Sequence, residues 1–274
     1  MRDLPKRLVI PVFLIASLAA GQGRAQSLDE RYWIEASVMW ADLDTRGDFR
    51  LPKAPEGGQM DFERDLGMDD RETLAAISGG YRHSERLTIN ADIYRLDRSS
   101  TEVLKRDIPF EIVTFPATAT IDSSFRSDIY RLTLGYSLIR RDNLEAGAAV
   151  GLHATDFDIR LAGRGKVGPV EVEEVVRRRT FLAPLPTAGV YGVWRPTPKV
   201  TFNGRADYLS LSLGDYHGGV LNMQAGAAYA VSQRVDLGVM YRYVDYDLSI
   251  EKRKWAGGLR YQFSGPAVFV RARF

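Results

Sequence analysis

Past residue 30, polar and apolar residues alternate along one segment of the chain after another. Between Leu221 and Val231 every odd-numbered residue is apolar, and every even-numbered residue is polar or small. The same period of two runs through residues 87–93, 130–138 and 235–243. Successive side chains of a strand point to opposite faces, whereas a helix would repeat apolar residues at spacings of three and four. These segments therefore predict strands with one apolar and one polar face.

The alternating segments are separated by connectors that are short and long in turn. The predicted strands are 31–42, 72–82, 86–97, 125–139, 144–161, 179–195, 199–213, 219–231, 234–249 and 258–274. The long connectors run over 42–71, 97–124 and 162–178. A tilted strand needs roughly 9–11 residues to cross a bilayer, and short turns on one side with long loops on the other are typical of outer-membrane barrels. The pattern predicts an all-β, closed antiparallel up-and-down transmembrane β-barrel of about ten strands, or of eight if one hairpin lies outside the membrane.

The first 25 residues have the composition of a secretory signal peptide. Three basic residues precede an apolar run from Leu8 to Ala20, and small residues precede a cleavage site after Ala25. The apolar run is shorter than the roughly 20 residues of a membrane-spanning helix, which argues against the alternative of a retained anchor. We expect 1–25 to be removed and 26–274 to form one barrel domain.

The charge balance changes when the leader is set aside. The leader holds four basic residues and one acidic residue of the 37 and 35 in the whole chain, which leaves 33 and 34. A nearly neutral chain gives no electrostatic footprint for nucleic acid, so no nucleic-acid partner is expected. The chain has no cysteine, which fits an exported protein that forms no disulfide.

Two strands carry irregularities. Pro184 and Pro186 weaken the sixth strand because proline cannot donate to a ladder, so this strand should join the barrel late or carry a bulge. In the last strand, Tyr261 and Phe263 have the opposite parity to Val268 and Val270. A bulge at the intervening Gly265-Pro266 would bring both groups to the lipid face.

If the apolar face meets lipid, the polar face lines the lumen. The charged residues and one histidine that parity places there are Glu35, Asp92, Arg131, Glu145, His153, Arg205, Asp207, Asp236, Arg242, Arg271 and Arg273. Isolated buried charges are very costly, so opposite charges should pair across a lumen this narrow. We expect a lumen largely plugged by charged side chains, with a selective conduction path as the alternative.

The sequence offers little catalytic chemistry. The histidines His83, His153 and His217 fall in different parts of the predicted barrel, and no GxSxG, HExxH or P-loop spacing is present. A lipid-modifying serine–histidine pair finds no matching motif, and a surface protease could use only Asp69-Asp70 with His217. We therefore predict no catalytic, cofactor-binding or metal-binding residue, and no enzyme.

Two loop segments invite other hypotheses. The first long loop is acidic and could bind calcium, or lipopolysaccharide through bridging cations, although its spacing does not fit an EF-hand. Its carboxylates are Asp44, Asp48, Asp61, Glu63, Asp65, Asp69 and Asp70. A solvated loop is the default expectation. The segment 170–179 is a candidate to extend a strand pair above the membrane.

The alternation, the leader and the ending from Tyr261 to Phe274 together resemble the small bacterial outer-membrane β-barrel superfamily, which includes relatives of the OmpA membrane domain. The resemblance covers residues 31–274 in pattern and transfers no residue role. It implies the bacterial outer membrane as location, membrane lipid and lipopolysaccharide as surroundings, and Phe274 as a signal for the barrel-assembly machinery. The expected role is structural or surface interaction. A narrow porin and a lipid-modifying enzyme are the alternatives, and a soluble lipocalin-like barrel is the rival fold.

Overall fold

The computed structural model describes residues 30–50, 59–167, 170–213, 216–252 and 255–274. The predicted signal peptide, residues 1–25, lies outside this part of the chain. All regular structure in the described ranges is β-strand. None of the described residues forms a helix long and apolar enough to cross a membrane.

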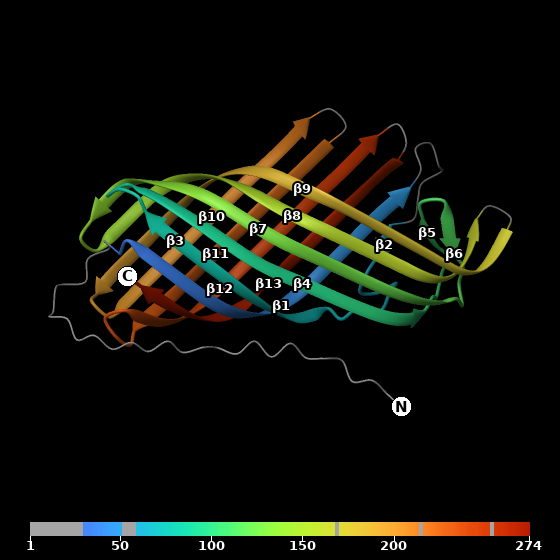
Figure 1. Cartoon of the computed structure of the whole chain (residues 1–274), viewed down its shortest axis with the longest axis horizontal. Coiled ribbons are helices and arrows are strands. Elements are labelled where there is room, and N and C mark those ends of the chain that lie inside the picture. Colours follow the sequence, from blue (N-terminus) through green and yellow to red (C-terminus); the bar gives the residue numbers. More distant parts are fainter. Residues whose placement is uncertain (1–29, 51–58, 168–169, 214–215, 253–254) are drawn as a thin grey trace.

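Ten long strands close into one antiparallel barrel (Figure 1). They are β1 (Tyr32–Arg50), β3 (Arg71–Arg82), β4 (Leu87–Val103), β7 (Thr120–Arg141), β8 (Leu144–Val167), β9 (Val170–Thr197), β10 (Val200–Leu213), β11 (Tyr216–Ala230), β12 (Val235–Lys252) and β13 (Trp255–Arg273). Each pairs with its neighbour along the chain, and β13 pairs with β1 from Trp33↔Arg273 to Arg50↔Ala256. The predicted fold class is confirmed, with ten strands rather than eight.

Three short strands supplement the barrel. They are β2 (Met60–Asp61), β5 (Ile108–Phe110) and β6 (Val113–Phe115). β2 pairs with β1, and the β5–β6 hairpin joins β8 through Thr114↔Lys166. All three lie at the end of the barrel away from Phe274, which we call the long-loop end (Figure 1). The opposite end, with the chain ends of β1 and β13, is the short-turn end.

Several strands run further toward the long-loop end than predicted. β1 continues to Arg50, β4 continues to Val103, and β7 begins at Thr120. The predicted connector 42–71 persists between Arg50 and Arg71 but is shorter than predicted, whereas 97–124 and 162–178 are wrong in large part because most of each is strand. The β8–β9 hairpin fills nearly all of the third, which supports the expected extension of residues 170–179.

The polarity of the wall inverts between the two halves, which explains the missed strand ends. In the short-turn half, exposed apolar side chains form an apolar belt: Ile34, Ile77, Ile93, Leu132, Leu134, Val150, Val190, Leu237, Val239, Val268 and Val270. In the long-loop half, the outward positions of β4 and β7 carry ion pairs such as Arg95–Asp128 and Arg126–Asp97. The inward positions there are apolar, so a pattern that expects oily side chains outside fails to recognise these residues as strand.

No bulge lies at Gly265-Pro266. The register of β13 with β12 passes through Arg242↔Gly265 and Tyr241↔Pro266 without a shift. Tyr261 and Phe263 consequently face the interior, where both are fully buried. The predicted bulge is wrong because the wall has already left the apolar belt at this level, and polar residues take the outward positions.

β9 joins the barrel wall late, as its two prolines indicate. It pairs with β10 only from Ala188↔Tyr208 toward the short-turn end. Before Ala188 it pairs with β8 alone, and Pro184 and Pro186 lie in that part. Proline is tolerated where one edge of a strand has no partner.

Candidate functional site

Charged side chains occupy the interior of the short-turn half. Nine of the residues that sequence parity placed inside are buried: Glu35, Asp92, Arg131, Glu145, His153, Asp207, Asp236, Arg242 and Arg273. The other two, Arg205 and Arg271, also face inward and are ion-paired. The period-two alternation of seven different strands brings these groups into one lumen.

Ion pairs ring the interior near the short-turn end. Arg271 Nη2 lies 2.6 Å from Glu35 Oε2, which links β13 to β1. Arg273 donates to Asp236 at 2.8 Å and to Glu30 at 2.6 Å. Each charge therefore has an opposite partner on a neighbouring strand or at the chain end.

Glu145 is the acceptor of a second group of ion pairs and hydrogen bonds near the short-turn end. It accepts hydrogen bonds from Arg82 at 2.9 Å, Arg140 at 3.2 Å and the Ser137 hydroxyl at 2.6 Å. Its side chain is 3% exposed. A carboxylate this deeply buried is stable only with such a set of donors.

Arg131 spans the middle of the lumen. Its guanidinium lies 3.4 Å from Asp92 on β4 and 3.3 Å from Asp207 on β10. On the ring of strands, β7, β8 and β9 separate β4 from β10, so the two carboxylates come from nearly opposite sides of the barrel. Arg205 also binds Asp207, at 2.7 Å. One arginine thus closes the lumen as a strut between two walls.

A cavity remains on the short-turn side of this strut. Its volume is about 170 Å³. Its lining includes Glu35, Asp92, Arg131, Glu145 and Arg271. A polar space of this size can hold several water molecules. It is a wet chamber bounded by ion pairs.

Aromatic side chains occupy the next layer toward the long-loop end. His153, the cross-strand neighbour of Arg131, hydrogen-bonds to the Tyr246 hydroxyl, and Thr155 bonds to the same hydroxyl at 2.8 Å. Above them, the ring of Tyr261 contacts that of Phe125 at a centroid distance of 5.3 Å. The Tyr261 hydroxyl accepts from Ser127 across the lumen at 3.3 Å. The interior at this level is a packed core.

A folded turn covers the aromatic layer. Residues 59–70, which we call the lid, place Met60, Phe62, Leu66 and Met68 against it, each at most 3% exposed. The rings of Phe62 and Phe125 pack edge to face at 5.4 Å. The lid is therefore part of the core of the long-loop half.

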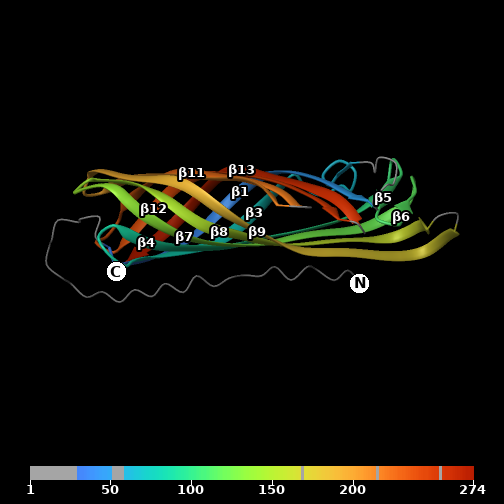
Figure 2. The same ribbon diagram turned by 90° about the horizontal axis from the view of Figure 1, so that it is seen from above.

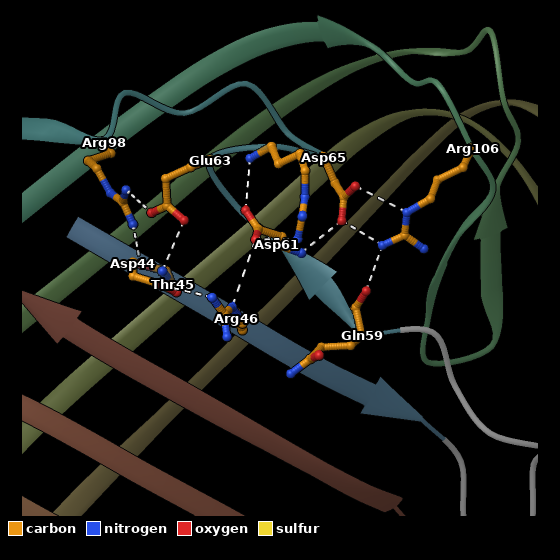
Figure 3. Close-up of polar contacts among 10 residues, drawn as sticks. Asp44, Thr45, Arg46, Gln59, Asp61, Glu63, Asp65, Arg98 and Arg106 are labelled. Atoms are coloured by element: carbon orange, nitrogen blue, oxygen red, sulfur yellow. Dashed lines mark hydrogen bonds and ion pairs between the residues drawn. The ribbon is translucent and has the colours of Figure 1, made fainter.

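Two arginines clamp the lid in place, Arg98 from within the barrel and the more exposed Arg106 from the solvent side (Figure 3). Arg98 on β4 donates to Glu63 at 2.5 Å and to the Thr45 hydroxyl at 2.6 Å, and its guanidinium lies over the ring of Phe125. Glu63 in turn accepts the backbone N–H of Thr45 at 2.9 Å. Arg106 binds Asp65 at 2.5 Å and the carbonyl of Gln59 at 2.6 Å.

The Asp65 carboxyl shows what this clamp does electrostatically. Partial burial raises its pKa, but the hydrogen bonds from Arg106 and the backbone N–H of Asp61, with the nearby positive charges, lower it more, so the pKa lies below the ordinary 3.8. A carboxyl with a depressed folded-state pKa stabilises the fold above its unfolded pKa, and this stabilisation is lost as the pH falls through the folded value. In the wild type the clamp should therefore loosen only below about pH 4.

We expect Asp65→Asn to loosen the lid at neutral pH. Trypsin should cleave after Arg64 up to about fivefold faster, because an exposed ion pair contributes at most about 1 kcal/mol. Mass spectrometry of the digest measures the rate. Asp97→Asn, which removes the exposed Asp97–Arg126 pair on the outer face of the wall, is the control and should leave the rate unchanged. Equal rates for the two variants would contradict the clamp.

The remaining candidates for chemistry do not converge. Asp69 and Asp70 precede β3, whereas His217 lies on β11, and β1, β13 and β12 separate these two strands in the ring. The described residues contain no group of three or more His, Cys, Asp or Glu side chains able to hold a metal. Asp61, Glu63 and Asp65 of the acidic loop are instead engaged by arginines. That the chain is no enzyme stays a prediction.

The aromatic layer and the lid are the features that sequence reasoning missed. The signal was present in the unbroken parity from Leu259 through Tyr261 and Phe263 to Phe269, all of which are buried. The polar residues between them mark the outward face of a wall outside the apolar belt.

Known outer-membrane proteins share the sequence pattern and the fold of this chain. The family model of the outer membrane protein beta-barrel domain matches residues 11–263. The structure is similar to that of the outer membrane protease OmpT from Escherichia coli, with a TM-score of 0.60 and 11% identity over 91% of this chain and 98% of that chain. OprG from Pseudomonas aeruginosa matches with a TM-score of 0.37 and 12% identity over 89% and 96% of the two chains. No curated protein matches the sequence. At these identities the structural likeness describes the fold and transfers no residue role.

Proposed function

Because the chain belongs to the outer membrane protein β-barrel domain family, a family that places it in the bacterial outer membrane, we propose that it is a closed barrel with a structural and surface-interaction role. One observation carries this proposal: Arg131 joins Asp92 and Asp207 across the lumen beneath a packed aromatic layer. The short turns would face the periplasm and the long-loop end the cell exterior, as in other outer-membrane barrels.

Three successive obstacles support a closed lumen. An ion entering from the short-turn end meets the Arg131 strut, then the His153–Tyr246 contact, then the aromatic layer with the lid behind it. Passage would separate buried ion pairs and open a packed core, and each of these steps costs several kcal/mol. The wet chamber on the short-turn side is therefore a dead end.

Conductance in planar bilayers tests the closed lumen against the narrow-porin alternative. We expect purified wild-type protein to give no current steps above baseline, while a general porin inserted under the same conditions conducts. Insertion is checked by protease protection of the apolar belt. Reproducible current steps from the inserted wild type would overturn the proposal.

The aromatic C-terminus supports a further part of the proposed role. Phe274 lies at the short-turn end and is exposed, and its carbonyl accepts the backbone N–H groups of Arg31 and Tyr32. An exposed aromatic side chain beside the end of β13 would be available for the barrel-assembly machinery to bind before the barrel closes. Membrane lipid and lipopolysaccharide would surround the apolar belt and the charged wall above it.

A further inference from the structure

The β8–β9 hairpin projects past the rest of the long-loop end along the long axis of the molecule (Figures 1 and 2). On one side, β9 pairs with β8 down the length of the projection. On its other side, residues 170–182 of β9 form no backbone pairing with any other described segment, because pairing with β10 begins only at Ala188. We call this stretch the free edge. An unpaired strand edge is a template for another strand.

The free edge has a polarised sequence. Glu171, Glu173 and Glu174 lie in its first half, and three arginines, 177–179, follow directly. Glu173 and Glu174 are exposed, and neither has a hydrogen-bond or ion-pair partner among the described residues. Because the acidic residues precede the basic ones, two copies of this edge that run in opposite directions bring the acidic residues of each copy next to the basic residues of the other.

The geometry points to antiparallel pairing of this edge with the free edge of a second copy of the chain. This proposal rests on the surface-interaction role proposed above and identifies a second copy of the chain as the partner in that interaction. Opposed residues of an antiparallel pair share a face, so a two-fold axis must relate residues of equal parity. With the axis at Val176, Glu174 faces Arg178 of the second copy, and each complex gains this pair twice. Arg178 also binds Asp158 of its own chain, and its exposed guanidinium would bridge the two carboxylates.

The same register matches the other outward positions. Val176 faces Val176, Val172 faces Thr180, and Val170 faces Leu182. Val170, Val176 and Leu182 are 59%, 46% and 61% exposed, and all three would be covered. On the inner face Glu173 meets Arg179, which already pairs with Glu111 of its own chain. Pro184 then ends the edge, because proline cannot donate to a ladder.

The register with its axis at Val175 also matches charges, because it opposes Glu173 to Arg177 and Glu171 to Arg179 on the inner face. On the outward face, however, it places Glu174 opposite Val176 and Val172 opposite Arg178. The axis at Val176 is preferred because it both pairs charges and opposes apolar residues to one another at the exposed outward positions. Parallel in-register pairing is worse, because it sets each glutamate against a glutamate and each arginine against an arginine, and like charges directly opposite are destabilising. The charge pattern therefore selects the antiparallel arrangement.

Antiparallel pairing fixes the orientation of the second barrel relative to the first. Two barrels in one membrane project their hairpins in the same direction, and their free edges would meet in parallel. Antiparallel pairing reverses the direction of the hairpin, so the second barrel points the opposite way. The partner is a copy in a facing membrane, and the contact is homophilic adhesion between two membranes.

Charge exchange between vesicles tests the pairing. Wild-type protein in phosphatidylcholine vesicles should cluster them, as measured by dynamic light scattering against protein-free vesicles. Glu174→Arg alone and Arg178→Glu alone should each weaken association by about tenfold, because two attractive pairs become repulsive. Vesicles of the first variant mixed with vesicles of the second should cluster again, as should vesicles of the double variant E174R/R178E.

A single cysteine checks the register. The chain has no cysteine of its own. Val176→Cys should form an intermolecular disulfide between vesicles under oxidation, because residue 176 faces itself at a Cα separation that a disulfide can span. Val172→Cys, which faces Thr180, should not. Circular dichroism verifies that every variant is a folded barrel.

The outcomes separate this inference from the proposed function. Absence of wild-type clustering, failure of the mixed variants to regain it, or equal cross-linking at 172 and 176 would overturn the self-pairing. Bilayer conductance of the same preparations reports on the closed lumen alone. A silent barrel that does not cluster would refute the adhesion and leave the closed barrel intact.

Discussion

Replacing Arg131 with methionine is expected to lower the free energy of unfolding by about 3–5 kcal/mol, the range for breaking a buried ion pair by removing one partner. The side chain of Arg131 is 3% exposed, as is that of Asp207, and Asp92 also lies inside the barrel. Methionine fills much of the same volume, so the loss comes mainly from Asp92, which loses its arginine, while Asp207 keeps only Arg205. Guanidinium unfolding in detergent micelles measures the difference.

A control substitution on the same strand and a second substitution that restores stability test the cause of this loss. Arg126→Met lies on the same strand but faces outward, where Arg126 forms an exposed pair with Asp97. It should change the free energy by no more than about 1 kcal/mol, as expected for surface ion pairs. Adding Asp92→Asn to Arg131→Met should recover part of the loss, because the carboxylate that loses its arginine disappears while Asp207 keeps its ion pair with Arg205. A loss no greater than that of Arg126→Met would show that the strut does not stabilise the barrel.

The sequence predicts the membrane half of this barrel well because alternation there has one simple cause. Lipid requires apolar side chains outside, so the polar positions of Leu132–Leu138 or Leu221–Val231 must face inward. Parity then places charged groups such as Arg131 and Asp236 inside without any knowledge of contacts. Which charges form ion pairs depends on the relative positions of strands far apart in sequence. The pairing of Arg131 with Asp92 and Asp207 therefore cannot be predicted from parity.

The long-loop half could not be predicted on the same rule because its environment is reversed. Past the apolar belt the wall meets water, and the interior becomes the apolar side. Phe125, Tyr261 and Phe263 keep the parity of the lumen but carry the composition expected of the lipid face. The bulge predicted at Gly265-Pro266 assumes that the outer face of the last strand meets lipid along its whole length. A lid that folds into the barrel gives no periodic signal, since residues 59–70 form turns around only two strand residues.

The core of the long-loop half should be as sensitive as that of a soluble protein. Phe125→Ala is expected to lower the free energy of unfolding by about 3–5 kcal/mol, the range for removing a buried phenylalanine. Phe125 is fully buried and contacts the rings of Phe62, Phe157 and Tyr261, and Arg98 lies over its face. The substitution therefore leaves a cavity beneath the lid and also removes the aromatic surface against which Arg98 is held.

Phe202→Ala is the control because Phe202 faces outward from β10, is 43% exposed and stacks on Trp194. Detergent replaces its contacts, so the loss should be at most about 1.5 kcal/mol, the contribution of one aromatic pair. Trypsin cleavage after Arg64 should accelerate in Phe125→Ala and not in Phe202→Ala, because only the first variant loosens the lid. If the two variants lost equal free energies of unfolding, the long-loop half would have no apolar core, and Phe125 would be in contact with detergent instead of packed side chains.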